Sequence, residues 1–93
     1  MISIEEKYQY GNLCDALCRN LNDNFMNVSF EIFENGDIQC KFILLKFSNR
    51  EEEYIEDIMA EFTALQTKDC VLKPIIEIGN EKKLKNIVFN NIG

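Results

Sequence analysis

The pair Asn35-Gly36 places the tightest constraint on how this chain folds. It lies between two stretches, 25–34 and 38–47, in which apolar and polar residues alternate with a period of two. Such alternation is typical of β-strands with one buried face, and Asn-Gly between two such stretches is the strongest short-range signal for a β-hairpin. The sequence therefore predicts a hairpin over residues 25–47.

The register of this hairpin is predicted from burial. A two-residue turn would place Phe30 opposite Lys41 and would mix apolar and polar side chains on each face. A three-residue loop, Asn35 to Asp37 with Gly36 in a left-handed conformation, instead makes one face uniformly apolar. The pairs expected in that register are Ile32 with Cys40, Phe30 with Phe42, and Val28 with Leu44.

The opposite face of the same hairpin is divided into two halves. The first half is polar, whereas the second half carries three apolar side chains, Ile43, Leu45 and Phe47. An exposed apolar row on a sheet marks a surface that something else covers. We therefore expect a partner or a second copy of the chain to lie over these three side chains.

Two helices are predicted, each preceded by a Ser-x-x-Glu sequence that forms a capping box. The first follows Ser3-Ile4-Glu5-Glu6, and Gly11 within it predicts a late start or a bend, because glycine costs about 1 kcal/mol relative to alanine in a helix. Spacings of three and four predict that its buried face contains Tyr10, Leu13, Cys14, Leu17, Cys18 and Leu21.

The second helix follows Ser48-Asn49-Arg50-Glu51 and is expected to end near residues 67–68. Its predicted buried face contains Tyr54, Ile55, Ile58, Met59, Phe62 and Leu65.

Two further strands are predicted over 71–78 and 84–89, as a second hairpin with a turn at Gly79-Asn80. Pro74 lacks an amide donor, which predicts an edge position or a bulge for the first of these strands. The order α-β-β-α-β-β predicts an α+β fold in a single compact domain, residues 1–93. Short connections favour a four-stranded, mainly antiparallel sheet with two helices packed on one face. The segments 3–47 and 48–93 share the order αββ and form a weak pseudo-repeat.

Composition argues against several classes of function. The chain has no histidine, which removes the usual general base, the commonest metal ligand and every nucleophile paired with histidine. Its net charge of -6 opposes binding to nucleic acid or to anionic membranes. No apolar run approaches the roughly 20 residues that span a bilayer, and the amino terminus does not resemble a secretory signal. We expect a cytoplasmic, non-enzymatic protein without a cofactor, of bacterial or phage type.

The four cysteines, Cys14, Cys18, Cys40 and Cys70, are expected to be thiols in a reducing compartment. Cys14 and Cys18 lie four residues apart, but zinc sites favour cysteines in a knuckle rather than within an amphipathic helix. We therefore expect both to fill the core, with no metal site. A thiol- or metal-dependent module is the less favoured interpretation. The lysines at 82, 83 and 85 are interpreted as protection of a sheet edge rather than as an anion site.

The strongest functional signal is a run of acidic residues on the second helix. Five carboxylates fall on the arc opposite its apolar face, and several are four residues apart with no lysine between them. Each such pair destabilises a helix by about 0.2–0.5 kcal/mol. The simplest interpretation is a solvated surface, and the functional one is a surface for a cationic partner. The residues concerned are Glu52, Glu53, Glu56, Asp57 and Glu61.

These features predict a protein-binding module that docks onto a basic protein through those five carboxylates. Ile43, Leu45 and Phe47 would provide an apolar anchor. One concrete form is an inhibitor of a nucleic-acid-acting protein, such as the immunity protein of a nuclease toxin or a phage-encoded antagonist, because such targets have cationic grooves. The alternative is a small homodimeric structural or adaptor domain, in which the apolar row is covered by a second copy and the acidic helix provides solubility.

Overall fold

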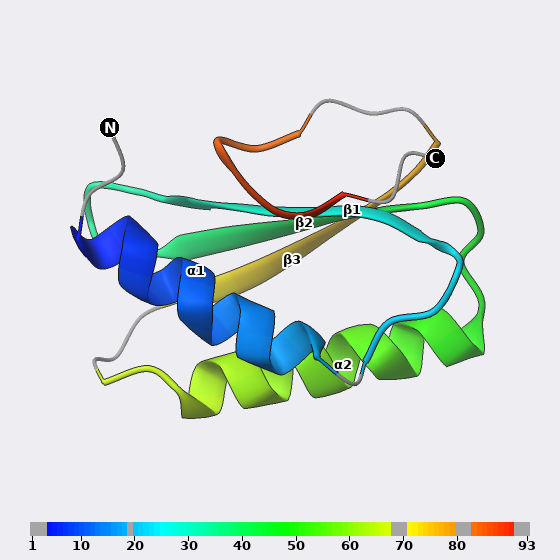
Figure 1. Cartoon of the computed structure of the whole chain (residues 1–93), viewed down its shortest axis with the longest axis horizontal. Coiled ribbons are helices and arrows are strands. Elements are labelled where there is room, and N and C mark those ends of the chain that lie inside the picture. The colour runs from blue at the N-terminus through cyan, green and yellow to red at the C-terminus, as the bar shows by residue number, and fades with distance from the viewer. Residues whose placement is uncertain (1–3, 19, 68–70, 80–82, 91–93) are drawn as a thin grey trace.

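The predicted α+β class and the four-stranded sheet are confirmed. A computed structural model describes residues 4–18, 20–67, 71–79 and 83–90. Two helices and four strands follow in the predicted order: α1 (Ile4–Leu17), β1 (Phe25–Ile32), β2 (Ile38–Leu44), α2 (Asn49–Ala64), β3 (Leu72–Ile78) and β4 (Asn86–Asn90). The strands form one sheet in the order β3-β2-β1-β4 (Figure 1). Ser3, Cys70 and Lys82 lie outside the described residues.

The hairpin of β1 and β2 is confirmed, but its register differs from the predicted one by two residues. Ile32 pairs with Ile38 and Phe30 with Cys40. The loop keeps the predicted length of three residues but begins one residue earlier, at Glu34, because the Phe33 amide donates to the Asp37 carbonyl at 2.9 Å. A shift of two residues leaves every side chain on the same face, so burial could not distinguish the two registers. Gly36 has the predicted positive φ, at 91°.

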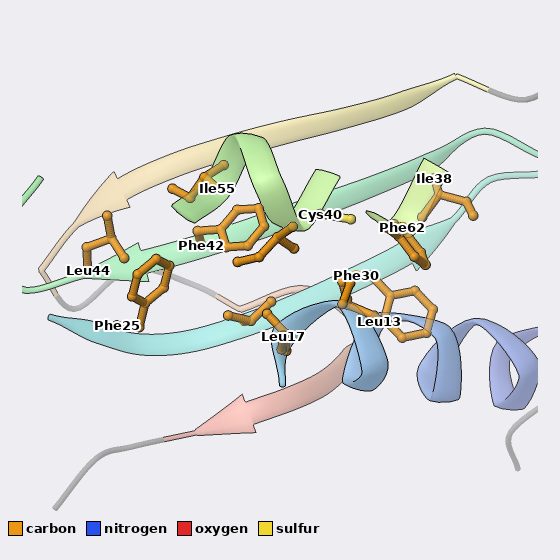
Figure 2. Packing of buried hydrophobic residues seen from close by; sticks show 13 residues of the cluster. Leu13, Leu17, Phe25, Phe30, Ile38, Cys40, Phe42, Leu44, Ile55 and Phe62 are labelled. Atoms are coloured by element: carbon orange, nitrogen blue, oxygen red, sulfur yellow. The ribbon is translucent and has the colours of Figure 1, made fainter. Parts of the chain in front are cut away.

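A bulge at Met26 turns Phe25 into the core. Phe25 pairs with Leu44 while Asn27 pairs with Ile43, which leaves Met26 without a partner on β2. The ring of Phe25 meets Phe42 edge to face at a centroid distance of 6.4 Å and Tyr54 of α2 at 6.3 Å. Figure 2 shows Phe25 beside Phe42 at the end of the sheet. The bulge therefore lets β1 bring one more aromatic side chain to the core.

The predicted second hairpin is wrong, because β3 and β4 lie at opposite edges of the sheet. β3 pairs with β2 in parallel, whereas β4 pairs antiparallel with β1. The sheet is therefore mixed. The physical reason is that α2 is long enough to act as a crossover, and a crossover connection makes neighbouring strands parallel. The edge position that Pro74 predicts for β3 is confirmed.

The core forms where both helices meet alternate residues of β1 and β2. Leu13 and Leu17 from α1 and Ile58 and Phe62 from α2 belong to the same buried cluster as Phe42 (Figure 2). In Figure 1 both helices are drawn below the sheet. Within the described residues, neither helix is long and apolar enough to cross a membrane.

The buried face of α1 is rotated relative to the prediction. Gln9 and Ala16 are buried, whereas Tyr10, Cys14 and Cys18 are exposed. The expectation that both thiols fill the core is therefore wrong. The rotation has a polar cause that apolar spacing does not detect: the amide groups of Gln9 and Gln66 bind each other, at 2.7 and 2.8 Å. α1 is helical from Ile4, so Gly11 does not delay its start.

The buried face of α2 matches the prediction more closely. Ile55, Ile58 and Phe62 are buried, Tyr54 and Met59 are partly buried, and Leu65 is exposed. Leu65 lies just beyond the helix, which ends at Ala64 rather than near residues 67–68.

The opposite face of the sheet is covered in part by the chain itself. Residues 83–85 precede β4, and the Leu84 amide donates to the Ser29 hydroxyl at 3.0 Å. Ser29 and Asn27 are buried there, together with Ile43, which is 2% exposed. Leu45 and Phe47 lie beyond the end of β2 and remain 60% and 39% exposed. The predicted apolar row is thus divided between the interior and the surface.

Candidate interaction surface

The acidic face of α2 is the most strongly charged surface that one described element carries. We use this name for five side chains, all of them exposed: Glu52, Glu53, Glu56, Asp57 and Glu61. They point outward because the helix buries Ile55, Ile58 and Phe62 against the sheet, and residues on the opposite arc then face solvent.

A capping box fixes where this helix begins, as predicted. Ser48 is the N-cap, and its amide donates to Oε1 of Glu51 at 2.8 Å. The Ser48 hydroxyl also donates to that oxygen. The side-chain amides of Asn22 and Asn24 donate to the other carboxylate oxygen, at 2.6 and 3.1 Å. The loop after α1 is therefore fastened to the first turn of α2.

Glu51 belongs to the acidic stretch in sequence but not to the acidic face. It is 1% exposed. The hydrogen bonds that it accepts, first from the Ser48 hydroxyl and then from Asn22 and Asn24, lower the pKa of its carboxyl from 4.5 to about 2. These donors stabilise the charged form. Glu51 therefore has its negative charge compensated within the fold.

The five carboxylates of the acidic face have no such compensation among the described residues. Among the described residues an ion pair joins Lys85, just before β4, to Glu6 of α1 at 2.8 Å, away from the acidic face. Asn86 also donates to Glu6, at 2.9 Å. No lysine or arginine in the described part of the chain lies within ion-pair distance of the acidic face. Its like charges, four residues apart along the helix, therefore repel one another without relief.

Exposed apolar side chains lie beside the start of the acidic helix. Leu45 and Phe47 precede Ser48, and Ile78 at the end of β3 is 51% exposed and pairs with Leu44. Ile43 was predicted to share this surface, but it is buried, at 2% exposed. What the structure brings together is an acidic helix face and a smaller apolar patch, formed by Leu45 and Phe47.

A separate hollow lies where α1 faces β4. It is apolar, has a volume of about 350 Å³, and is lined by Cys14, Leu17, Cys18, Leu21, Val88 and Phe89. Sequence analysis missed this hollow, because nothing in the sequence placed β4 beside α1. Partial burial, and secondarily the Asp15 carboxylate, raises the pKa of Cys14, which disfavours the reactive thiolate. Within the described residues no three acidic or thiol side chains gather as a metal site would require.

A second hollow, of about 450 Å³, lies between the start of α1, the β1–β2 loop and the end of α2. Gln9 and Gln66 line it, together with the acidic side chains Glu5 and Glu34. Its lining also includes Thr67 and contains no cysteine or lysine.

The acidic face is therefore the surface on which a functional interpretation of this structure rests. Comparison of the chain with models of known protein families, and with curated proteins, finds no match in either.

Proposed function

We propose that this protein is a non-enzymatic binding module that docks through the acidic face of α2 onto a basic protein. The observation that carries the proposal is the lack of any cationic partner for the five carboxylates among the described residues. Three pairs of like charges stand four residues apart: Glu52 with Glu56, Glu53 with Asp57, and Asp57 with Glu61. A cationic partner would relieve the repulsion in all three at once.

An acidic face of this kind would raise the rate of association with a basic protein as well as contribute contacts in the complex. A cluster of charges of one sign steers an oppositely charged protein toward it and raises the rate of encounter. Leu45 and Phe47, exposed beside the helix start, would add apolar contact at the border of the charged area. Interfaces commonly combine apolar contacts with polar and charged ones.

The partner class that fits best is a nucleic-acid-acting protein. Such proteins bind phosphates through grooves rich in lysine and arginine. An acidic helix placed in such a groove occupies the positions that phosphates would take. The protein would then act as an inhibitor, as an immunity protein does toward a nuclease toxin or a phage-encoded antagonist toward its target.

Capture of the natural partner tests this proposal. Immobilised wild-type protein is exposed to extract of the cells that produce it, beside the double variant Glu53→Lys/Asp57→Lys. The matched control, Asp23→Lys/Glu34→Lys, makes the same change in charge at two exposed residues outside α2. We expect the wild type and the control to retain a basic protein, and the helix variant to lose it by about tenfold or more.

Salt and activity provide the second readout. Raising the ionic strength to about 1 M shortens the screening length to about 3 Å and should release the captured protein. The nucleic-acid-directed activity of that protein should fall when the wild type is added and should not fall with the helix variant. Equal capture by all three proteins, insensitive to salt, would show that the acidic face does not bind the captured protein.

A further inference from the structure

The edge of the sheet formed by β3 presents backbone groups that no described strand uses. The Val71 carbonyl accepts from the Ile38 amide of β2, and the Gly79 amide donates to the Leu44 carbonyl of β2, each at 2.9 Å. Backbone groups alternate in direction along a strand, so the odd-numbered residues from 71 to 79 are directed toward β2. The even-numbered residues of β3 therefore direct their amides and carbonyls to the open edge.

The position of Pro74 agrees with this alternation. Its residue number is even, so the amide proton that proline lacks would have pointed outward and is not needed by β2. The open edge consequently offers amides from Leu72, Ile76 and Ile78, and carbonyls from those residues and Pro74. Any strand that pairs there must tolerate one missing donor near the middle.

The side chains of β3 are apolar on the face shared with the core. Ile76 pairs with Phe42 and Ile78 with Leu44, yet they are 37% and 51% exposed. Pro74 is exposed on the same face. On the opposite face lie Lys73, Ile75 and Glu77. The strand thus carries an uncovered apolar row on one face and two opposite charges, four residues apart, on the other.

We propose that the β3 edge pairs with the same edge of a second copy of this chain. The two strands run antiparallel about a two-fold axis at Ile75, so that the two sheets become one. In this register Leu72 lies opposite Ile78 of the other copy and Pro74 opposite Ile76. Every outward amide then meets a carbonyl, and the donor that is absent is the one at Pro74.

Charge selects this register and favours a second copy over an unrelated strand. With the axis at Ile75, Lys73 of each copy lies directly opposite Glu77 of the other, giving two pairs of opposite charge. A shift by two residues in one direction places Pro74 opposite itself, and in the other direction places Glu77 opposite Ile75. The strand is thus complementary to itself in the register that pairs all of β3, from Leu72 to Ile78.

The proposed dimer uses a surface different from the acidic face of α2. It also differs from the dimer that the sequence suggested through Ile43, Leu45 and Phe47, in which Ile43 would have to be accessible. The two proposals are therefore independent, and capture of a basic protein does not depend on pairing at β3.

Sedimentation equilibrium over a range of protein concentrations, at physiological ionic strength, tests the dimer. The wild type should approach twice the chain mass of 10.9 kDa. Lys73→Glu and Glu77→Lys each place like charges opposite one another at both ends of the paired strands. Each variant should weaken the dimer by about ten- to a hundredfold. Lys7→Glu and Glu34→Lys, which make the same changes of charge at exposed sites elsewhere, should leave it unchanged.

Mixing the two charge-reversal variants tests directly whether residues 73 and 77 lie opposite each other in the dimer. The edges of Lys73→Glu and Glu77→Lys complement each other, so an equimolar mixture should recover the dimer that neither variant forms alone. A variant that fails to fold could not give this recovery. A wild type that remains at 10.9 kDa throughout, a dimer insensitive to either reversal, or a mixture that stays monomeric would each overturn the proposal.

Discussion

At the scale of single residues, the same side-chain type takes opposite roles within one helix. Glu51 and Glu52 are neighbours in sequence, yet Glu51 is buried and accepts four hydrogen bonds, whereas the exposed Glu52 carboxylate accepts none from the described residues. The Ser-x-x-Glu spacing identified Glu51 as a cap. The amides of Asn22 and Asn24 that complete its site come from a loop 27–29 residues earlier, which local spacing does not reveal.

The lowered pKa of Glu51 predicts how the stability of the protein depends on pH. Its folded-state pKa of about 2 lies below the ordinary value of 4.5, so its contribution is fully present above pH 4.5 and is lost as the pH falls toward 2. Glu51→Gln should therefore be less stable than the wild type at neutral pH. The difference between them should shrink between pH 4.5 and 2 in acid unfolding experiments.

Glu53→Gln is the matched control for this experiment, because Glu53 lies on the same helix and is exposed. It should not show the loss of stability at neutral pH that Glu51→Gln shows. If the free energies of unfolding of the wild type and Glu51→Gln differed by the same amount across this pH range, the role assigned to the Glu51 carboxylate would be contradicted.

The cysteines provide a second test at this scale. Cys14 and Cys18 are exposed, whereas Cys40 is fully buried and burial raises its pKa to about 12. Under native conditions a maleimide reagent should label Cys14 and Cys18 and should leave Cys40 unlabelled until the protein unfolds. Peptide mass mapping of the labelled protein distinguishes the sites. Rapid native labelling of Cys40 would show that the core packing described above is wrong.

At the scale of elements, local patterns predicted which segments are helices and strands but not how distant strands pair. The Asn-Gly hairpin and the Ser48 cap are local, and both formed. The partners of β3 and β4 depend on contacts far apart in sequence, such as Asn86 with Glu6, 80 residues away. The rotated face of α1 has the same origin, since Gln9 is buried by its contact with Gln66.

The continuous α1 helix predicts an effect of replacing Gly11. A Cβ added there would meet nothing within 4 Å, and the residue is exposed within the helix. Gly11→Ala should therefore raise the free energy of unfolding by about 1 kcal/mol. Denaturant titration measures this directly.

Gly36→Ala provides the contrast, because Gly36 also has open space but has a φ of 91°. A left-handed conformation of this kind costs a residue with a side chain about 1–2 kcal/mol, so this variant should be less stable than the wild type. If Gly11→Ala lowered the stability as well, the helix would not run through residue 11 as described.

At the scale of the whole molecule, the sequence predicted the fold class and the acidic face but not the division of the apolar row. Ile43 was grouped with Leu45 and Phe47 because all three share one face of the hairpin. In the structure Ile43 is 2% exposed, whereas Leu45 and Phe47, which follow the end of β2, are 60% and 39% exposed. The five carboxylates are exposed because a helix with one apolar side leaves its other side to solvent.

Repulsion within the acidic face of the free protein is what a cationic partner is proposed to relieve. The most direct test is the free energy of unfolding of Asp57→Lys at low salt, compared with the wild type. Lysine at this position turns two repulsive pairs, with Glu53 and Glu61, into attractive ones, so the variant should be more stable by about 1 kcal/mol. An equal or lower stability would show that no repulsion exists for a partner to relieve, and would contradict the account.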